Sequence, residues 1–239
     1  MPPAGPRIAF FGGSFDPPHR GHLAIARAAQ TALSLHQVLF APVGAQPLKP
    51  RGSTASFDDR VAMTRLAIAG DSAFALSLID APNQTGTPNY TYDTLLTLKS
   101  QLPAATTLFF LMGADSFLAL HHWHRGAELP FLAPLIVASR PGQGFADLAT
   151  ILPAGLSLAA DCAPAPTPSS LHLETCTLRN TAGATTPFHL LPGLHIDISA
   201  TAIRDEVHRE VTPIPAGQGH HSDLPDAVFD YIAAHNLYR

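Results

Sequence analysis

Short apolar runs alternate with helix-like segments along most of this chain, and that alternation limits the folds it can adopt. Apolar runs that end in turn residues predict buried strands. We expect strands at residues 8–11, 38–41, 74–79, 108–112, 135–139 and 195–198. We expect helices from about residue 21, from an N-cap at Ser56 through Ile68, over 92–102, from about residue 199 and over 225–235. The predicted class is therefore α/β, a doubly wound parallel sheet with helices on both faces and ligands at the carboxyl ends of its strands.

Residues 142–193 interrupt the alternation. This stretch places Pro164, Pro166 and Pro168 among Ser, Thr and Ala residues, and it shows little helical or strand periodicity. Such a sequence favours an irregular insertion with some strand, located before the last strand of the sheet. We therefore predict one domain over residues 1–239 that carries this insertion and ends in helices.

The composition narrows the class of partner. With 239 residues, of which 46% are hydrophobic and 13% charged, the chain can bury a sizeable core, yet no apolar run is long enough to cross a bilayer. A net charge of −4 argues against a broad grip on nucleic acid, so we expect a small-molecule partner and neither nucleic acid nor membrane. The sequence carries no indication of an oligomeric state.

The two cysteines, Cys162 and Cys176, indicate neither a disulfide framework nor a CxxC metal site. The N-terminal residues lack the apolar stretch of a signal peptide. Both observations favour a cytoplasmic location.

The segment GGSFDPPHRGH, residues 12–22, is the most informative stretch of the chain. Gly12 and Gly13 follow the first predicted strand, where the absence of side chains lets the backbone approach a ligand closely. A helix that begins near Gly21 directs its backbone N–H groups and the positive end of its dipole toward the same place. We therefore expect an anion to bind here.

His19 and His22 lie three residues apart at this helix start. An imidazole, neutral or charged, can donate a hydrogen bond to non-bridging phosphate oxygens as charge builds up in a transition state. The alternative is a pair of exposed histidines with no catalytic role, and for an isolated HxGH motif the two interpretations would be about equally plausible. The preceding strand and the glycines favour the phosphate-binding interpretation.

Further segments extend this pattern downstream. They are PNYTYDTL (88–95), LMGADSFLALHHWHR (111–125), SRPG (139–142), ISATAIR (198–204) and VFDYIAAHNLY (228–238). Together with residues 12–22 they resemble the HxGH nucleotidyltransferases, and most specifically the bacterial nicotinate-nucleotide adenylyltransferases. The resemblance covers most of the chain except the insertion, and it implies a Rossmann-like nucleotidyltransferase fold.

The resemblance implies which residues bind ATP. His19, His22 and Arg204 would contact the phosphates and carry the catalysis. The remaining ATP-binding residues would be Gly12, Gly13, Ser14, Phe15, Lys49, Gly113, Asp115, Ser116, Ile198, Ser199 and Thr201. The residue chemistry agrees, because Ser199 can cap a helix and Arg204 offers a planar fork of donors to a phosphate. For Arg204 taken alone, a place on a solvated helix face would be the favoured interpretation.

The resemblance also implies a pocket for the acceptor, formed by Thr91, Tyr92, Trp123 and Arg140. Backbone amides near Thr91 would meet the nicotinate carboxylate, and the indole of Trp123 would stack on the cationic pyridinium ring. Without this context, a single tryptophan is more often a plain packing residue.

The histidines of HHWHR, namely His121, His122 and His124, could also suggest a zinc site. No carboxylate or cysteine nearby completes such a site, and the spacing lacks the i, i+4 pair that puts two imidazoles on one helical face. We expect no protein-held metal, and we expect Mg²⁺ to be bound mainly through ATP.

Two positions depart from the family pattern. Leu48 stands before Lys49 where relatives commonly have histidine, and Ala200 stands where serine is frequent. Both departures concern the finer phosphate contacts, and neither touches the HRGH centre.

These observations predict adenylyl transfer from ATP to nicotinate mononucleotide, which yields deamido-NAD and pyrophosphate. An HxGH adenylyltransferase with nicotinamide mononucleotide or phosphopantetheine as acceptor is an alternative, although the phosphopantetheine enzymes are shorter and lack the PNYTYDTL and HHWHR segments. A non-catalytic nucleotide-binding protein is another, yet both His22 and Arg204 are present. An oxidoreductase is less favoured, because GGSFDPPHRGH is not a GxGxxG fingerprint.

Overall fold

The structure is a computed structural model. It describes residues 5–48, 52–83, 86–139, 150–159, 163–164, 172–192, 198–209 and 221–239. Within these ranges, helices and strands alternate as the sequence predicts from β1 (Arg7–Gly13) to β5 (Leu135–Ala138). Strands β6 to β9 then follow one another, and helices α7 and α8 (Asp226–Ala234) come after them.

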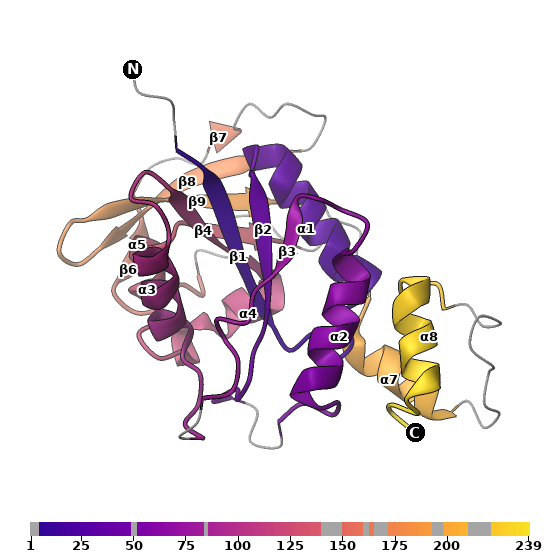
Figure 1. Cartoon of the computed structure of the whole chain (residues 1–239). Coiled ribbons are helices and arrows are strands. Elements are labelled where there is room, and N and C mark those ends of the chain that lie inside the picture. The colour runs from indigo at the N-terminus through magenta and orange to yellow at the C-terminus, as the bar shows by residue number, and fades with distance from the viewer. Residues whose placement is uncertain are drawn as a thin grey trace. The chain divides into compact units, whose positions relative to one another are not determined.

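The strands form one sheet in the order β3-β2-β1-β4-β5-β9-β8-β6, with β7 paired to β8 (Figure 1). Their bounds are β1 Arg7–Gly13, β2 Gln37–Pro42, β3 Phe74–Leu76, β4 Thr107–Gly113, β5 Leu135–Ala138, β6 Leu156–Leu158, β7 Ala163–Pro164, β8 Glu174–Asn180 and β9 Thr185–Leu191. β4 pairs in parallel with β1 and with β5, which in turn pairs in parallel with β9. The predicted parallel α/β sheet is confirmed.

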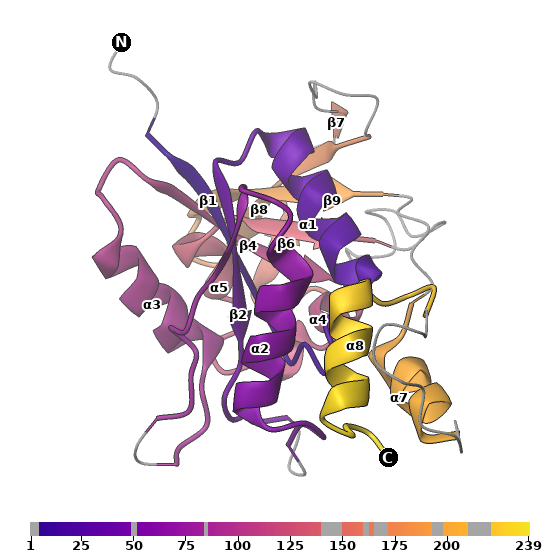
Figure 2. The ribbon, with the colours of Figure 1, turned by 45° about the vertical axis from the view of Figure 1, so that its right-hand side comes forward.

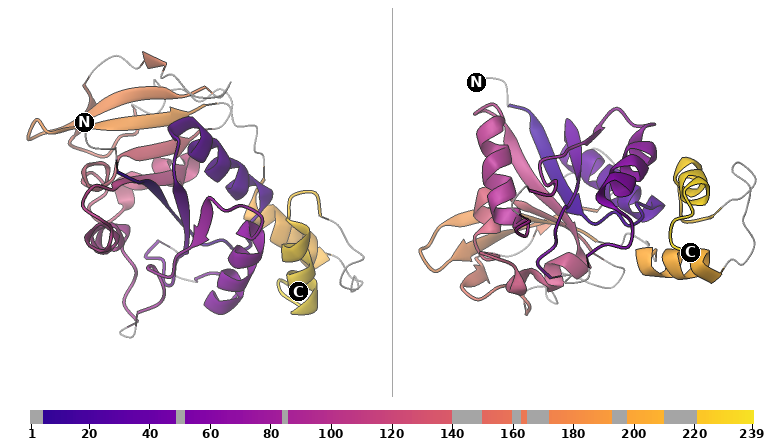
Figure 3. Two further views of the ribbon diagram at one scale, coloured as in Figure 1. Left: turned by 45° about the horizontal axis from the view of Figure 1, so that its top comes forward. Right: turned by 60° about the horizontal axis from the view of Figure 1, so that its bottom comes forward.

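The helices are α1 Arg20–Leu33, α2 Phe57–Ile68, α3 Thr91–Gln101, α4 Ala114–Leu118, α5 Leu129–Leu132, α7 Ala200–Arg209 and α8 Asp226–Ala234, with a short 3₁₀ turn, η1, at Leu120–His122. The C-terminal part of α1 and helix α3 lie on opposite faces of the sheet (Figures 1 and 3). The predicted N-cap of α2 is confirmed, because the Ser56 hydroxyl accepts a hydrogen bond from the Asp59 amide at 3.1 Å. The sequence did not predict α4, η1 or α5, which are too short to show a helical period.

The region after residue 142 is more regular than the sequence predicted. β8 and β9 form an antiparallel hairpin that joins the main sheet through β9 (Figure 3). Gly183, with φ of +83°, supplies the left-handed backbone of the connecting turn. The strand that we expected at residues 195–198 falls largely on residues outside the described ranges, and Ile198 itself is not in a strand. Among the described residues, β9 is the last strand of the sheet in chain order.

Two compact units make up the chain. One consists of Met1–Phe11, Ile25–Leu39 and Tyr90–His195, and the other of Gly12–Ala24, Phe40–Asn89 and Ile196–Arg239. The first holds β4, β5 and the β8–β9 hairpin. The second holds α2, α7, α8 and the segment 12–22. That residues 1–239 form a single domain stays a prediction.

The second unit has its own apolar core. α2 and α8 lie side by side (Figure 2), and α7 completes the cluster through Ile203 and Val207. The fully buried members of this cluster include Met63 of α2 and Val228 of α8. Helices α7 and α8 are far from residues 12–22 in the sequence. Packing in this apolar core holds both helices in the unit that carries the HxGH motif.

Cys176 on β8 is buried and disulfide-bonded. From the sequence, the two cysteines indicate no disulfide framework, and the bond at Cys176 corrects that expectation. Cys162 lies outside the described residues. No helix in the described part of the chain combines the length and the apolar character needed to span a membrane.

Candidate functional site

We call residues 12–22, which join β1 to the first turn of α1, the histidine loop. A side chain at Gly13 would place its Cβ 3.2 Å from the ring of Phe15, which is 2% exposed. The Phe15 backbone has φ of +48°, a left-handed conformation that is uncommon for a bulky residue. Its ring contacts the His22 imidazole edge-on, with centroids 5.0 Å apart. Gly13 and Phe15 therefore shape the loop around His22.

His19 and His22 form a stacked pair. Their ring centroids are 3.7 Å apart with an interplanar angle of 28°, and His19 is 7% exposed. The His19 amide donates a hydrogen bond to Nδ1 of His22 at 3.2 Å, which leaves the proton of the neutral His22 ring on Nε2. The buried Nδ1 of His19 has no hydrogen-bond partner within the described residues. The alternative of two exposed histidines at a helix start is wrong.

Burial controls the charge of this pair. Desolvation lowers the pKa of His19 to about 4, although the nearby Asp223 carboxylate opposes the shift. Desolvation also lowers the pKa of His22 well below its usual value, and the neighbouring His19 lowers it further. Both rings are neutral near pH 7, so each can donate one N–H to a phosphate oxygen.

The folded protein should lose stability as the pH falls from about 6.5 toward 4. The unfolded chain binds a proton at the ordinary histidine pKa, whereas folded His19 does so only near pH 4, so the unfolded state takes up more protons in this window. At pH 5 this difference costs about 2 kcal/mol for each such histidine. His189 on β9, whose pKa burial also lowers to about 4, should act in the same direction.

Urea unfolding at pH 7 and pH 5 measures this effect. The variants His19→Gln and His189→Gln should each lose less stability between the two pH values than the wild type does. An unchanged pH dependence in both variants would show that buried neutral histidines do not govern acid unfolding.

The first turn of α1 differs from the expectation of free amides. The Arg20 amide donates to the Asp223 carbonyl at 2.8 Å, and the His22 and Leu23 amides donate to the His19 carbonyl at 2.9 and 3.4 Å. These three donors already have acceptors within the protein. The anion-binding capacity of the loop therefore rests on the imidazoles more than on the helix start.

Arg60 of α2 supports the histidine loop from inside the protein, a role that the sequence analysis missed. Its guanidinium donates from Nη1 to the Ser14 carbonyl at 2.7 Å and from Nη2 to the Val43 carbonyl at 2.9 Å. Arg60 is 2% exposed, and desolvation lowers its pKa while the Asp16 carboxylate opposes the shift. No local sequence pattern indicates this role, because the partners of Arg60 are backbone carbonyls far away in the chain.

Arg204 on α7 is bound to the same loop. It donates from Nη1 to the Asp16 carbonyl at 2.7 Å and from Nη2 to the Thr201 hydroxyl at 3.1 Å. Ser199 precedes α7, and its hydroxyl accepts from the Ala202 amide at 3.5 Å, a long capping bond in the predicted place. The structure thus brings His19, His22, Arg204 and Thr201 together around the histidine loop. Ile198 packs against the core of this unit.

Gly113, Asp115 and Ser116 belong to the other unit, at the carboxyl end of β4. Gly113 is the last residue of β4 and the N-cap of α4, and Asp115 is exposed in the first turn of that helix. This is where a parallel sheet positions ligand-binding residues.

The predicted acceptor residues lie in the same unit as β4. Thr91 is the first residue of α3, which begins without a side-chain capping bond. Tyr92 is buried, and the Arg125 guanidinium lies 3.6 Å from the centroid of its ring. Arg125 in turn forms a two-point ion pair with Glu128. Trp123 is half-buried, with its ring centroid 6.1 Å from that of Phe110 on β4.

Two predicted site residues, Lys49 and Arg140, lie outside the described residues. Of the two departures from the family pattern, Leu48 is 54% exposed and Ala200 is the first residue of α7. In the described part of the chain, no group of three or more His, Cys, Asp or Glu residues is placed to hold a metal ion.

Known proteins resemble this chain over nearly its full length. The cytidylyltransferase-like family matches residues 10–206. A probable nicotinate-nucleotide adenylyltransferase of Gloeobacter violaceus is 38% identical over 235 residues, covering 98% of this chain and 97% of the relative. One of Laribacter hongkongensis is also 38% identical, over 237 residues, covering 98% and 96%.

Among solved structures, the fold is similar to that of Plasmodium falciparum nicotinic acid mononucleotide adenylyltransferase complexed with NaAD. The TM-score is 0.67 at 18% identity, with 98% of each chain covered. The resemblance inferred from residues 12–22 and the downstream segments is confirmed. On the strength of its sequence relatives, the chain belongs to the nicotinate-nucleotide adenylyltransferases of the cytidylyltransferase-like family.

Proposed function

We propose that this protein transfers the adenylyl group of ATP to nicotinate mononucleotide, forming deamido-NAD and pyrophosphate. The observation that carries the proposal is the stacked, neutral His19–His22 pair in a loop that also binds Arg204. The described residues offer no hydrogen-bond partner to the buried Nδ1 of His19. This supports the proposal, because buried polar atoms are normally satisfied and a ligand oxygen that reached this atom would satisfy it.

The reaction is a displacement at phosphorus. An oxygen of the 5′-phosphate of the mononucleotide forms a bond to the α-phosphorus of ATP, and the bond from that phosphorus to the oxygen bridging to the β-phosphate breaks. A phosphate monoester has its second pKa near about 6, so the nucleophile is mostly a dianion at pH 7 and needs no strong general base.

The work of the protein is then alignment and charge stabilisation. Neutral imidazoles at His19 and His22 would each donate one hydrogen bond to phosphate oxygens, and the Arg204 guanidinium would supply positive charge. The hydrogen bonds from Arg204 to the Asp16 carbonyl and to Thr201 hold its side chain in place before substrate arrives. Buried Arg60 holds the histidine loop through its hydrogen bond to the Ser14 carbonyl.

We propose Mg²⁺ as the cofactor, held by the phosphate oxygens of ATP and by water. In the part of the chain that the structure describes, no three His, Cys, Asp or Glu residues are grouped to hold the ion, which supports binding through ATP. A magnesium ion carried by ATP offsets negative charge on the triphosphate. No step in the chemistry above is assigned to it.

For the acceptor, we propose that the start of α3 at Thr91 binds the nicotinate carboxylate and that Trp123 stacks on the pyridinium. The uncapped first turn of α3 supports the first contact, and the partial exposure of Trp123 supports the second. Gly113, Asp115 and Ser116 are proposed to contact the adenosine. A cytoplasmic location remains a prediction.

The test is an acceptor panel. Purified protein, ATP and Mg²⁺ are incubated with nicotinate mononucleotide, nicotinamide mononucleotide or phosphopantetheine, and pyrophosphate release is followed. Release that depends on nicotinate mononucleotide supports the proposal. Release with phosphopantetheine alone would assign the other adenylyltransferase function, and no release with any acceptor would favour a non-catalytic nucleotide-binding protein.

A further inference from the structure

The end of the chain is built into the histidine loop. The hydroxyl of Tyr238, the penultimate residue, donates a hydrogen bond to Oδ1 of Asp16 at 2.8 Å, across 222 positions of sequence. The function proposed above gives no role to this contact. We propose that the C-terminal segment, residues 221–239, positions the histidine loop for catalysis and that Tyr238 is a positioning residue acting through Asp16.

Asp16 is the centre of this arrangement. It lies within the histidine loop, three residues before His19, and is 5% exposed. Its carboxylate accepts from the Thr54 amide at 2.6 Å and from the Ala55 amide at 3.1 Å, in addition to the Tyr238 hydroxyl. A buried carboxylate that accepts three hydrogen bonds from three separate donors has one stable position. The loop backbone at this residue is therefore fixed.

Fixing Asp16 also fixes the cation of the site. The Asp16 carbonyl is the acceptor for Nη1 of Arg204, at 2.7 Å. Tyr238 thus binds the Asp16 side chain, and the Asp16 backbone carbonyl binds Arg204. A shift of Asp16 would move the guanidinium and, through the short chain segment to His19, the stacked imidazoles.

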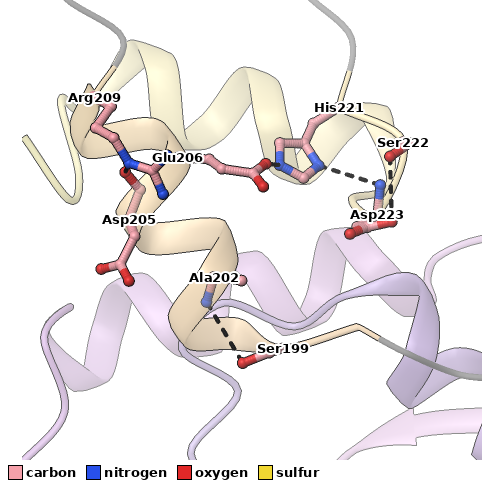
Figure 4. A network of polar contacts seen from close by, with 8 residues as sticks. All are labelled: Ser199, Ala202, Asp205, Glu206, Arg209, His221, Ser222 and Asp223. Carbon is pink, nitrogen blue, oxygen red and sulfur yellow. Dashed lines mark hydrogen bonds and ion pairs between the residues drawn. The ribbon is translucent and has the colours of Figure 1, made fainter.

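A second contact anchors the other end of the loop. The Asp223 carbonyl accepts from the Arg20 amide at 2.8 Å, at the residue between His19 and Gly21. Asp223 is itself held by a polar network (Figure 4), in which its amide donates to Nδ1 of His221 at 3.2 Å and Nε2 of His221 contacts the Glu206 carboxylate at 2.9 Å. The C-terminal segment therefore contacts the loop on both sides of His19, at Asp16 and at Arg20.

The conformation of the chain end supports a specific role. Tyr238 has φ of +66° and Asn236 has φ of +51°, left-handed conformations that are uncommon outside glycine. Such backbone persists where surrounding contacts over-determine it. Here the ring of Tyr238 packs against the core of α2, α7 and α8, and this packing directs its hydroxyl to Asp16. Burial and the Asp16 carboxylate raise the pKa of Tyr238, so the hydroxyl keeps its proton and remains a donor.

The substitution Tyr238→Phe removes only the hydroxyl and keeps the ring in the core. This expectation rests on the proposed adenylyl transfer. We expect kcat to fall by about five- to thirtyfold, because a histidine loop that is no longer held in place aligns its side chains less well with the reacting phosphates. The KM for ATP should change less than kcat, since the binding groups are all still present.

Tyr231→Phe is the matched control. Tyr231 lies on α8, and its hydroxyl also donates to a carboxylate, Oδ1 of Asp59 at 3.0 Å. Asp59 belongs to α2 and not to the histidine loop. Both variants lose one tyrosine–carboxylate hydrogen bond at the C-terminal segment. Only Tyr238→Phe should lower kcat, and an equal loss in Tyr231→Phe would overturn a specific positioning role.

Hydrogen–deuterium exchange keeps this test separate from the proposed function. Peptides that cover residues 12–22 and the Thr54 and Ala55 amides should exchange faster in Tyr238→Phe than in the wild type, and should be unchanged in Tyr231→Phe. If the wild type transferred no adenylyl group while the exchange responded in this way, the proposed function would fail and the positioning role would stand.

Wild-type exchange in these peptides of Tyr238→Phe, together with wild-type kcat, would overturn the inference. Asp16→Asn provides a second route to the same contact. If Tyr238 acts through Asp16, the loss in kcat of the double variant should be smaller than the product of the two single losses.

Discussion

Replacement of His22 by alanine is expected to lower kcat by about a hundred- to ten-thousandfold. The substitution removes the neutral imidazole, with its proton on Nε2, from the stacked pair. It thereby removes the proposed hydrogen-bond donor to charge that develops in the transition state. Because His22 is a single side chain in a loop held by Asp16 and Arg60, the melting temperature should change little. Steady-state kinetics and thermal melting measure the two quantities.

The variant His22→Asn separates chemistry from structure. The asparagine oxygen can take the place of Nδ1 and accept from the His19 amide, while the Nε2 donor is lost. Both His22→Asn and His22→Ala should therefore be severely impaired. Near-normal turnover in His22→Asn would mean that His22 serves to hold the loop and does not act on the phosphates.

Nicotinate mononucleotide should be preferred over nicotinamide mononucleotide by roughly ten- to a hundredfold in kcat/KM. Backbone N–H donors at the uncapped start of α3 suit two carboxylate oxygens, but they oppose the NH₂ group of an amide. A donor that faces another donor in a desolvated pocket costs about 1 to 3 kcal/mol, which sets the size of the expected preference.

Trp123→Ala tests the two halves of this pocket independently. Stacking on a pyridinium contributes about 0.5 to 2 kcal/mol and does not depend on the substituent that the ring carries. The variant should therefore use both mononucleotides less efficiently and change their ratio much less. Competition kinetics decide the matter, and equal efficiencies in the wild type, or a preference for the amide, would reject the carboxylate contact at Thr91.

The parts of the fold that the sequence predicted are those with a local signal. The run Ile8–Phe11 lies within β1, and the Ser56 hydroxyl caps α2 as its spacing to Asp59 indicates. β9 was missed because its sequence, TTPFHLL, contains a proline, which argues against an interior strand. The strand tolerates this proline because of its register. β9 pairs with β5 only from Phe188 onward, one residue beyond Pro187.

The residues of the candidate site also differ in whether a local sequence signal predicts them. The motif HRGH and the segment ISATAIR are contiguous, so their histidines and Arg204 could be predicted from the sequence. The residues that hold them in place could not, because Arg60 reaches the Ser14 carbonyl and Tyr238 reaches Asp16 across 46 and 222 positions. The occupied amide of Arg20 at the start of α1 was also unpredictable, because its acceptor is the carbonyl of Asp223, about 200 positions later in the chain.

The most direct measurement follows the α-phosphate of ATP. Protein, Mg²⁺ and nicotinate mononucleotide are incubated with ATP labelled at the α-phosphorus, and the products are separated. Attack by the 5′-phosphate on that phosphorus predicts that the label enters a dinucleotide with the mass of deamido-NAD, with one unlabelled pyrophosphate released per dinucleotide. Label recovered as free AMP or ADP, or dinucleotide formation that proceeds equally well in His22→Ala, would contradict adenylyl transfer by the histidine loop.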